Sequence, residues 1–383
     1  MIHYITIWGE NNLGRRLAYS PGGLKKAKYV VDVLSRIDDV KIVSFASGGR
    51  EWNGFYRKTK DKWRDNIDVE FCYTFGSRIK YFRMLERWFN ILQMIFYFIR
   101  VPKDDIIVVY HERYFRYAIK FLKKIRSTPK IILQVEELYT MVGNHPQNMI
   151  DTEINSIREA DAYILVNDVI SSILCLKAPL SCVAYGPYIV NDISINEMSF
   201  MDNKIHVIYA GTFDRIKRGA EMAVNACRYL PENYCVHIAG FGKPNEVSYI
   251  KLLIEKIKSV SQCEIIFEGC LSGKDYDNLL SKCAIGLSTQ VSAEFKYSDT
   301  SFPSKVINYL SYGLTVVSTK IKVLEISKVS DLLSFYMEDD PKSVARAIID
   351  CPIIEKMYAI QRIKKLDIMF EKQIKEIIQC LKK

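Results

Sequence analysis

Residues 301–317, SFPSKVINYLSYGLTVV, hold side chains and backbone groups suited to binding a phosphate. Pro303 fits the first turn of a helix, where its missing N–H costs nothing. Thr300 or Ser301 can cap that turn, and the free N–H groups of the turn together with Lys305 form a place for an anion. This order of residues therefore predicts a helix start that binds phosphate.

The rest of the segment extends that prediction along one helix and one strand. Asn308 lies one helical turn beyond Lys305 and projects from the same face. Gly313 ends the helix. Residues 315–319, TVVST, are rich in β-branched side chains and are expected to form a buried strand. A helix–strand unit of this kind also occurs in α/β proteins of other functions, which is the alternative.

A second basic loop, GTFDRIKRG, follows an expected strand over residues 205–209. When a sugar leaves a diphosphate, negative charge develops on the phosphate oxygens, and fixed cations there lower the barrier. Arg215, Lys217 and Arg218 supply such cations. The alternative is that this loop is simply solvated.

Two carboxylates, Glu136 and Glu137, end an expected strand over residues 130–135. One of them can take the proton of an acceptor hydroxyl or hydrogen-bond the donor sugar. Successive side chains of extended chain point to opposite sides, so only one should face the site. The alternative is a pair of surface charges at a helix start. His111 follows another strand and can line the same site with Glu112 and Arg113, although a structural role is the alternative for a lone histidine.

Strands and helices alternate twice along the chain, which favours an α/β protein with two Rossmann-like, doubly wound domains facing a cleft. Ligands of such sheets bind at the carboxyl ends of the strands. We expect residues 1–190 to bind the acceptor, residues 204–350 to bind the nucleotide sugar, and residues 351–383 to form a helical tail. The expected strands span residues 2–8, 40–46, 106–110, 130–135, 162–166, 205–209, 235–239, 264–267, 284–288 and 315–319. The expected helices span residues 24–37, 154–159, 220–229, 247–260, 341–350 and 354–381.

The motifs YAGTFDRIKRG, HIAGFG, EGCLS and SFPSKVINYLSYG, in this order, resemble the second half of GT-B glycosyltransferases similar to glycosyltransferase family 4. The N-terminal half resembles their acceptor domain more loosely, through a Pro21-Gly22-Gly23 loop. The resemblance implies a retaining transfer from a nucleoside-diphosphate sugar. It places donor-binding residues at Gly22, Gly23, Gly211, Thr212, Arg215, Lys217, Gly240, Gly242, Ser301, Phe302, Pro303, Ser304 and Asn308. It places catalytic residues at Glu136, Glu137, Arg218 and Lys305.

The chain departs from the family pattern at two places. Thr212 stands where the family often has arginine. The family's Glu-x7-Glu pair maps onto Thr300 and Asn308, and the second glutamate of that pair holds the ribose. An amide can still bond ribose hydroxyls, but it carries no charge. A shifted frame with Glu294 in this role is the alternative.

Composition favours a soluble globular protein of 383 residues, with 49% hydrophobic and 26% charged residues. The N-terminus has no signal-peptide pattern, and the ten cysteines include no C-x-x-C, so we expect reduced thiols in the cytoplasm and no zinc. We expect neither an Asp-x-Asp metal motif nor a cluster of metal ligands, and therefore a metal-independent reaction without a cofactor.

The net charge of +10 is concentrated in residues 57–130, which hold 18 Lys and Arg against 8 Asp and Glu. Within them, residues 88–99 are apolar and aromatic but too short to span a bilayer. We expect this segment to bind the anionic inner face of the plasma membrane. The alternative is a core helix in which Trp88, Phe89, Leu92, Phe96 and Ile99 are buried. No nucleic-acid motif is present, so a nucleic-acid partner is not expected.

These observations predict a glycosyltransferase that acts on a glycan, plausibly a lipid-linked one, in polysaccharide biosynthesis. A non-catalytic subunit that binds glycan or a partner enzyme, and a nucleotide-sugar epimerase, are the alternatives. A Rossmann oxidoreductase is disfavoured because no G-x-G-x-x-G follows a strand.

Overall fold

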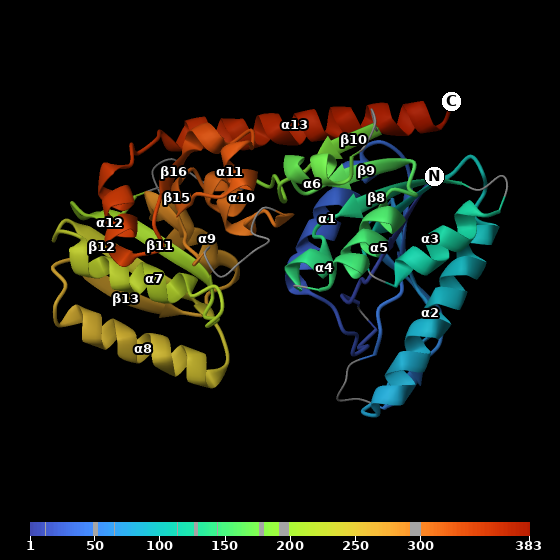
Figure 1. Cartoon of the computed structure of the whole chain (residues 1–383), viewed down its shortest axis with the longest axis horizontal. Coiled ribbons are helices and arrows are strands. Elements are labelled where there is room, and N and C mark those ends of the chain that lie inside the picture. The colour runs from blue at the N-terminus through green and yellow to red at the C-terminus, as the bar shows by residue number, and fades with distance from the viewer. Residues whose placement is uncertain are drawn as a thin grey trace. The chain divides into compact units, whose positions relative to one another are not determined.

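The computed structural model describes residues 1–11, 13–48, 53–64, 66–112, 114–125, 129–143, 145–175, 180–190, 199–291 and 300–383. The chain divides into two compact units, Met1–Pro187 with Ile368–Lys383 and Tyr188–Asp367. Each unit has its own largely parallel sheet covered by helices (Figure 1). The expectation of two Rossmann-like α/β domains is confirmed.

The sheet of the first unit has the order β10-β9-β8-β7-β1-β2-β5-β4 among the described residues. All neighbouring strands are parallel except the edge strand β4, which pairs antiparallel with β5. Central strands such as β7 are runs of Val and Ile buried on both faces, as parallel sheets require. The strands are β1 (Ile2–Thr6), β2 (Val40–Ser44), β4 (Thr59–Arg64), β5 (Ile67–Phe71), β7 (Ile106–Tyr110), β8 (Lys130–Val135), β9 (Ala162–Leu165) and β10 (Leu180–Val183).

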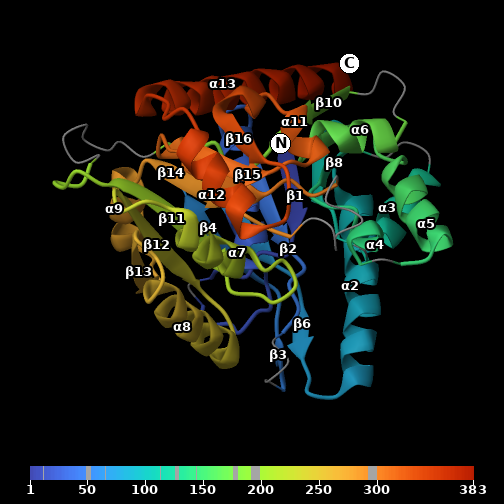
Figure 2. The same cartoon turned by 60° about the vertical axis from the view of Figure 1, so that its left-hand side comes forward.

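A short antiparallel pair lies outside this sheet, β3 (Gly54–Tyr56) with β6 (Thr74–Gly76), next to the long helix α2 (Figure 2). The helices of the first unit are α1 (Pro21–Ser35), α2 (Lys80–Arg100), α3 (Phe115–Lys123), α4 (Tyr139–Val142), α5 (Gln147–Ile157) and α6 (Asp168–Ile173). No described helix combines the length and the apolar character needed to cross a membrane.

The sheet of the second unit is parallel throughout its described strands, in the order β13-β12-β11-β14-β15-β16. Its strands are β11 (Ile205–Thr212), β12 (Tyr234–Phe241), β13 (Glu264–Gly269), β14 (Ile285–Ser288), β15 (Thr315–Thr319) and β16 (Leu333–Tyr336). Its helices are α7 (Gly219–Ala226), α8 (Pro244–Lys258), α9 (Gly273–Lys282), α10 (Ser304–Ser311), α11 (Lys322–Glu325) and α12 (Pro341–Asp350), with 3₁₀ turns at Cys227–Tyr229 and Ser330–Leu332.

One face of the second sheet forms a core with α7, α8 and α12, in which Val207, Val236 and Ile254 are fully or almost fully buried. The last helix, α13 (Lys356–Leu381), begins in the second unit and ends in the first. Its terminal part stacks Phe370 on Tyr29 and pairs Glu371 with Arg36.

Some local expectations are wrong. The first strand ends at Thr6 rather than Trp8, and the second ends at Ser44 rather than Ala46. Gly22 and Gly23 do not form a loop, because Ser20 caps α1 by accepting a hydrogen bond from the Gly23 N–H and Pro21 begins the helix. The run Ser-Pro-Gly-Gly therefore starts a helix with proline in its first turn, and the two glycines belong to that turn.

Candidate functional site

The carboxyl ends of β11 and β12 bring two glycines very close together. Gly211 pairs with Gly240, and a Cβ on Gly240 would lie 1.9 Å from the Gly211 carbonyl oxygen. A Cβ on Gly211 would lie 2.5 Å from the Lys305 Nζ. Only glycine fits at position 240, and Gly211 leaves room for the Lys305 ammonium, so the two motifs GTFDRIKRG and HIAGFG meet Lys305 at one edge of the sheet.

Lys305, in the first turn of α10, places its Nζ 3.7 Å from the centroid of the Tyr209 ring. Burial of the ammonium, with a smaller repulsion from Lys217, lowers the pKa of Lys305 to about 7. Asp214 acts to raise the pKa of Lys305, but no ion pair joins the two side chains. Lys305 also forms no ion pair with any other residue that the structure describes. An anion bound here would therefore stabilise the ammonium.

The loop after β11 is shaped by Asp214. Its carboxylate accepts hydrogen bonds from the N–H groups of Ile216 and Lys217 and from the Thr212 hydroxyl. This turn orders the loop that carries the predicted cations.

Both arginines of this loop have side-chain neighbours on the helices of the second unit. Arg215 stacks over the Tyr249 ring at 5.0 Å, and the Arg218 guanidinium lies 2.7 Å from the Glu221 carboxylate. Arg218 has a left-handed backbone with φ of 51°, which is uncommon outside glycine.

The helix start predicted at 301–305 is confirmed in position, but not in its cap. Pro303, rather than Thr300 or Ser301, is the N-cap residue of α10, and its side chain makes no capping hydrogen bond. Phe302 is buried, whereas Ser304 is exposed. Tyr309 anchors the helix to the sheet, because its hydroxyl accepts a 2.8 Å hydrogen bond from the Ala210 N–H. The sequence analysis missed this positioning residue, although its place next to Asn308 within a helix could have suggested it.

Asn308 is half-buried and donates a 2.8 Å hydrogen bond to the hydroxyl of Tyr276 on α9. Burial raises the pKa of Tyr276 to about 12, so this hydroxyl is protonated at neutral pH. The alternative residue Glu294 lies outside the described residues.

The neighbouring segment contains an Asp-x-Asp pair, Asp275-Tyr276-Asp277, so the expectation that the chain has no such pair is wrong. It lies on α9, where positions two apart do not share a face. Asp277 accepts a 2.5 Å hydrogen bond from Tyr312, so it braces α9 against the residue that follows α10.

In the first unit, the residues at the carboxyl ends of β7 and β8 form a compact polar cluster. Glu136 is buried, and its two carboxylate oxygens lie 2.5 Å from the Lys26 Nζ and 2.7 Å from the Gln134 amide. The alternative of a surface charge is therefore wrong for Glu136. Gly23, in the first turn of α1, comes close to the Tyr110 hydroxyl of this cluster, and Gly22 has open space around it.

Glu137 and His111 lie beside this cluster. Glu137 is half-buried, and its backbone carbonyl accepts a hydrogen bond from His111 Nδ1 at 3.2 Å. His111 is buried with its Nε2 3.7 Å from the Glu153 carboxylate. Glu153 in turn accepts hydrogen bonds from the Tyr139 and Thr140 backbone, which indicates a structural role for His111. Arg113 lies outside the described residues.

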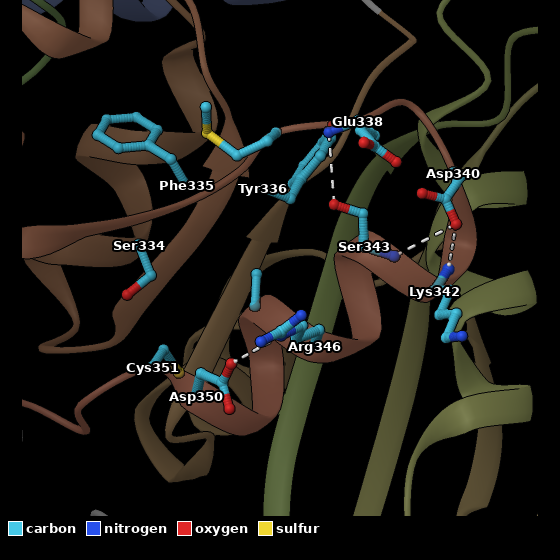
Figure 3. A pocket seen from close by; sticks show the side chains of 12 residues that line it. Ser334, Phe335, Tyr336, Glu338, Asp340, Lys342, Ser343, Arg346, Asp350 and Cys351 are labelled. Carbon is cyan, nitrogen blue, oxygen red and sulfur yellow. Dashed lines mark hydrogen bonds and ion pairs between the residues drawn. The ribbon is translucent and has the colours of Figure 1, made fainter.

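A pocket between β16 and α12 contains none of the predicted site residues (Figure 3). Asp340 caps α12 there by accepting hydrogen bonds from the Lys342 and Ser343 N–H groups, so the helix start is already satisfied. This pocket gives no reason to move the donor site away from Lys305.

Residues 204–351 match the profile of the family described as "Glycosyl transferases group 1". The search of curated proteins found no match. Among solved structures, the whole chain is similar to Anabaena Alr3699/HepE in complex with UDP, with a TM-score of 0.66, 15% identity and 99% of each chain covered.

The chain is also similar to an alpha,alpha-trehalose-phosphate synthase (UDP-forming) from Burkholderia xenovorans in complex with glucose-6-phosphate, with a TM-score of 0.64, 10% identity and 100% of each chain covered. A third similar structure is described as "Trehalose-6-phosphate from E. coli bound with UDP-2-fluoro glucose", with a TM-score of 0.62, 11% identity and coverage of 100% of this chain and 99% of that one. At these identities the likeness shows the fold.

Proposed function

We propose that this chain, which carries a glycosyltransferase group 1 domain over residues 204–351 and has the GT-B fold, transfers a sugar from a nucleoside-diphosphate sugar to a hydroxyl. The observation that carries the proposal is Lys305, a half-buried ammonium without a described ion-pair partner beside Gly211 at the edge where β11 ends. Such a cation is suited to a diphosphate.

The residues around Lys305 would act on the leaving group. The bond between the anomeric carbon and the diphosphate breaks, its electron pair stays on the phosphate oxygen, and the acceptor oxygen bonds to the anomeric carbon. Lys305, Arg218 and the N–H groups at the start of α10 stabilise the charge that develops there. The acceptor proton passes to a base, for which Glu137 is the candidate in the first unit. Retention of configuration and transfer without a metal ion are parts of the same proposal.

Thermal-shift and turnover measurements on the purified chain with UDP-glucose and other sugar nucleotides test the proposal. A donor at 100 times its dissociation constant should stabilise the protein by about 2.7 kcal/mol. Release of nucleoside diphosphate that depends on an acceptor glycan supports transfer. Stabilisation without release would favour a non-catalytic subunit, and an epimerised sugar without acceptor would favour an epimerase.

We further propose that the acceptor is a lipid-linked glycan of polysaccharide biosynthesis, reached from the cytoplasmic face of an anionic membrane. The support is an apolar stripe on α2. Its members are spaced three or four residues apart, so they share one helix face, and all are half or more exposed. The stripe consists of Tyr81, Leu85, Trp88, Leu92, Phe96 and Ile99.

The stripe lies opposite the buried face of α2, which includes Asn90, Met94 and Phe98. The alternative in which Trp88, Phe89, Leu92, Phe96 and Ile99 are all buried is therefore wrong, since each is 37–58% exposed. Phe121 and Tyr117 of the adjoining helix α3 are exposed as well. A continuous exposed apolar face of this kind marks a binding surface.

The charges around the stripe favour an anionic bilayer as its partner. Glu86 is the single acidic residue of α2 and is buried, whereas the helix carries Lys80, Arg83, Arg87 and Arg100. Helix α3 adds Arg116 and Lys120 and has no acidic residue. Each basic residue near such a surface contributes about 1 kcal/mol to binding.

Co-sedimentation with phosphatidylcholine vesicles, with and without phosphatidylglycerol, tests this surface. We expect binding to the anionic vesicles that weakens with salt and is lost in a Leu92→Gln/Phe96→Gln variant. Ile368→Gln is the matched control, because Ile368 is an exposed apolar residue on α13. Equal binding of both variants, or dimerisation of the wild type through the stripe without vesicle binding, would overturn the proposal.

A further inference from the structure

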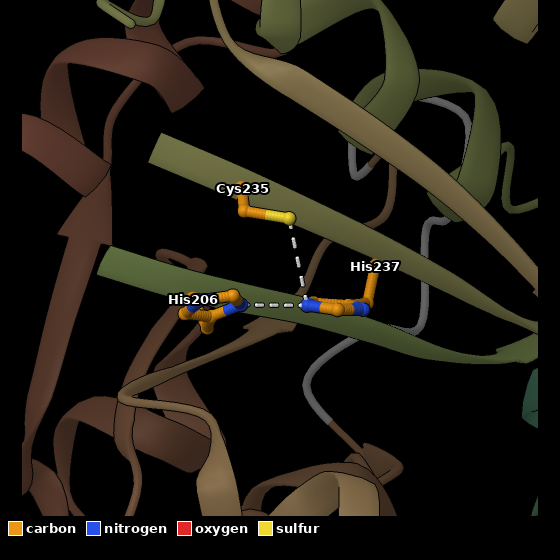
Figure 4. Close-up of side chains that lie close together, drawn as sticks. All are labelled: His206, Cys235 and His237. Atoms are coloured by element: carbon orange, nitrogen blue, oxygen red, sulfur yellow. Dashed lines mark hydrogen bonds between the residues drawn. The ribbon is translucent and has the colours of Figure 1, made fainter. Parts of the chain in front are cut away.

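Two histidines and a cysteine meet on one face of the second sheet, at its amino edge (Figure 4). His206 is near the start of β11, and Cys235 and His237 are on the neighbouring strand β12. The three side chains are between 0 and 5% exposed. His206 Nδ1 lies 2.8 Å from His237 Nε2, which lies 3.6 Å from Cys235 Sγ.

Each histidine also faces a carboxylate through its other ring nitrogen. His206 Nε2 lies 2.8 Å from Asp202 Oδ1, and His237 Nδ1 lies 2.7 Å from Glu268 Oε1. These partners fix the tautomers, because an ionised carboxylate only accepts hydrogen bonds. The lone pairs of His206 Nδ1 and His237 Nε2 are then directed at each other.

The two neutral histidines carry one proton too few for these contacts. Three contacts of hydrogen-bond length, carboxylate to His206, His206 to His237 and His237 to carboxylate, need three protons, whereas two neutral imidazoles carry two. The Cys235 thiol can offer its proton to His237 but does not lie between the two rings. An imidazolium would supply the third proton at the cost of a buried charge, and a metal ion would satisfy both lone pairs at once.

We propose that His206, Cys235 and His237 bind a zinc ion. Zinc prefers imidazole nitrogen and thiolate sulfur, and tetrahedral coordination separates two nitrogens by about 3.3 Å and nitrogen from sulfur by about 3.6 Å. The sulfur–nitrogen distance to His237 already fits, and the two rings need to part by a fraction of an ångström.

The residues around the cluster are arranged as they are around metal ions in proteins. Ligating histidines generally donate their second N–H to a carboxylate, as His206 and His237 are placed to do here. Phe200 covers His206 with a ring stacked at 3.7 Å. Gly211 lies five positions after His206 on β11, about 17 Å along the strand, so the ion would stabilise the sheet rather than contact the donor.

Titration of the untagged, EDTA-treated full-length chain with Co²⁺ tests the site without any variant. We expect one equivalent to bind, with a thiolate-to-cobalt charge-transfer band and the intense visible bands of tetrahedral Co²⁺. Zn²⁺ should displace the cobalt and raise the melting temperature. Absence of the charge-transfer band in the wild type overturns the proposal.

Variants then assign the ligands. Cys235→Ser should lose the charge-transfer band, and Glu268→Gln should keep it while weakening Co²⁺ binding about 10–100-fold. Cys270→Ser is the matched control, because Cys270 is exposed in the same unit and outside the cluster. A band that persists in Cys235→Ser, or disappears in Cys270→Ser, contradicts the assignment. None of these outcomes bears on sugar transfer at Lys305.

Discussion

Lys26 and Lys305 are lysines of two helices, one in each unit, and they are satisfied in opposite ways. The Lys26 ammonium lies 2.5 Å from the Glu136 carboxylate, which is also bonded to Gln134. The Lys305 ammonium rests on an aromatic ring, beside a glycine and near another lysine. Lys26 is therefore part of an ion pair within the fold, whereas Lys305 is suited to binding an anion.

This difference separates a stabilising residue from a binding residue. Removal of one partner of a half-buried ion pair lowers the stability of the fold, because the other charge remains without its counter-charge. A buried ammonium without a counter-charge already weakens the fold, and its removal relieves that cost. The two lysines should therefore respond to the same substitution with opposite changes in stability.

Replacement by methionine has the largest expected effect. Lys305→Met should lower donor-dependent turnover on the order of 10²–10³-fold, as loss of one group that stabilises the transition state does, and should keep or raise the melting temperature. Lys26→Met should lower the melting temperature. Turnover assays and thermal melts of both variants measure this. Near wild-type turnover in Lys305→Met, with Arg218→Ala equally mild, would refute the donor site.

The two adjacent glutamates sharpen the comparison within the first unit. Because both oxygens of Glu136 are occupied, we expect Glu136→Gln to act mainly on stability. Glu137→Gln should lower turnover about 10²-fold, the lower limit for loss of a general base, with little change in melting temperature. Equal and mild effects of both substitutions on turnover would remove the glutamates from the reaction.

The pKa of Lys305 makes donor binding depend on pH. A bound diphosphate favours the ammonium and raises its pKa above the value of about 7 in the free protein. Protons are thus taken up on binding, so affinity for UDP-glucose should be constant below pH 7 and fall about 10-fold per pH unit above it. Calorimetric titrations between pH 6 and about 9 measure this.

Lys305→Arg is the matched control for that pH dependence, because a guanidinium stays protonated throughout this range. Its affinity for UDP-glucose should be flat with pH. A wild type as flat as this variant would show that the Lys305 ammonium does not meet the diphosphate.

Asn308 has the smallest expected effect. Its amide already bonds Tyr276, so Asn308→Ala should weaken nucleoside-diphosphate binding by about 1 kcal/mol, near the lower end for loss of one buried hydrogen bond. Tyr276→Phe is the control that removes the same internal bond but leaves the amide. If both substitutions weaken binding equally, Asn308 acts through Tyr276 and does not contact the ribose.

The sequence predicted those parts of the structure that depend on interactions between residues close together in the chain. The helix start at Pro303 and the parallel strands follow from residues close together in the chain. The partners of Lys305 were not predictable in the same way, because Gly211 and Tyr209 come from a distant strand. Likewise the Cys235-x-His237 spacing gained meaning only when β11 placed His206 beside it, and Glu136 gained its partner from α1. Gly22 and Gly23 were misplaced because Ser20 and Pro21 favour a helix start more strongly than the glycines favour a loop.

The position of helix α13 affects the order in which the two units can be completed while the chain is being made. Residues 368–383 belong to the first unit, where Phe370 packs on Tyr29 and Lys382 pairs with Asp38. The second unit is continuous in sequence, whereas the first also needs residues 368–383, which are made after the whole of the second unit. On a chain made from its N-terminus, the unit that begins first is therefore completed after the second, and a nascent first unit lacks the packing partner of Tyr29 until residue 370 has left the ribosome.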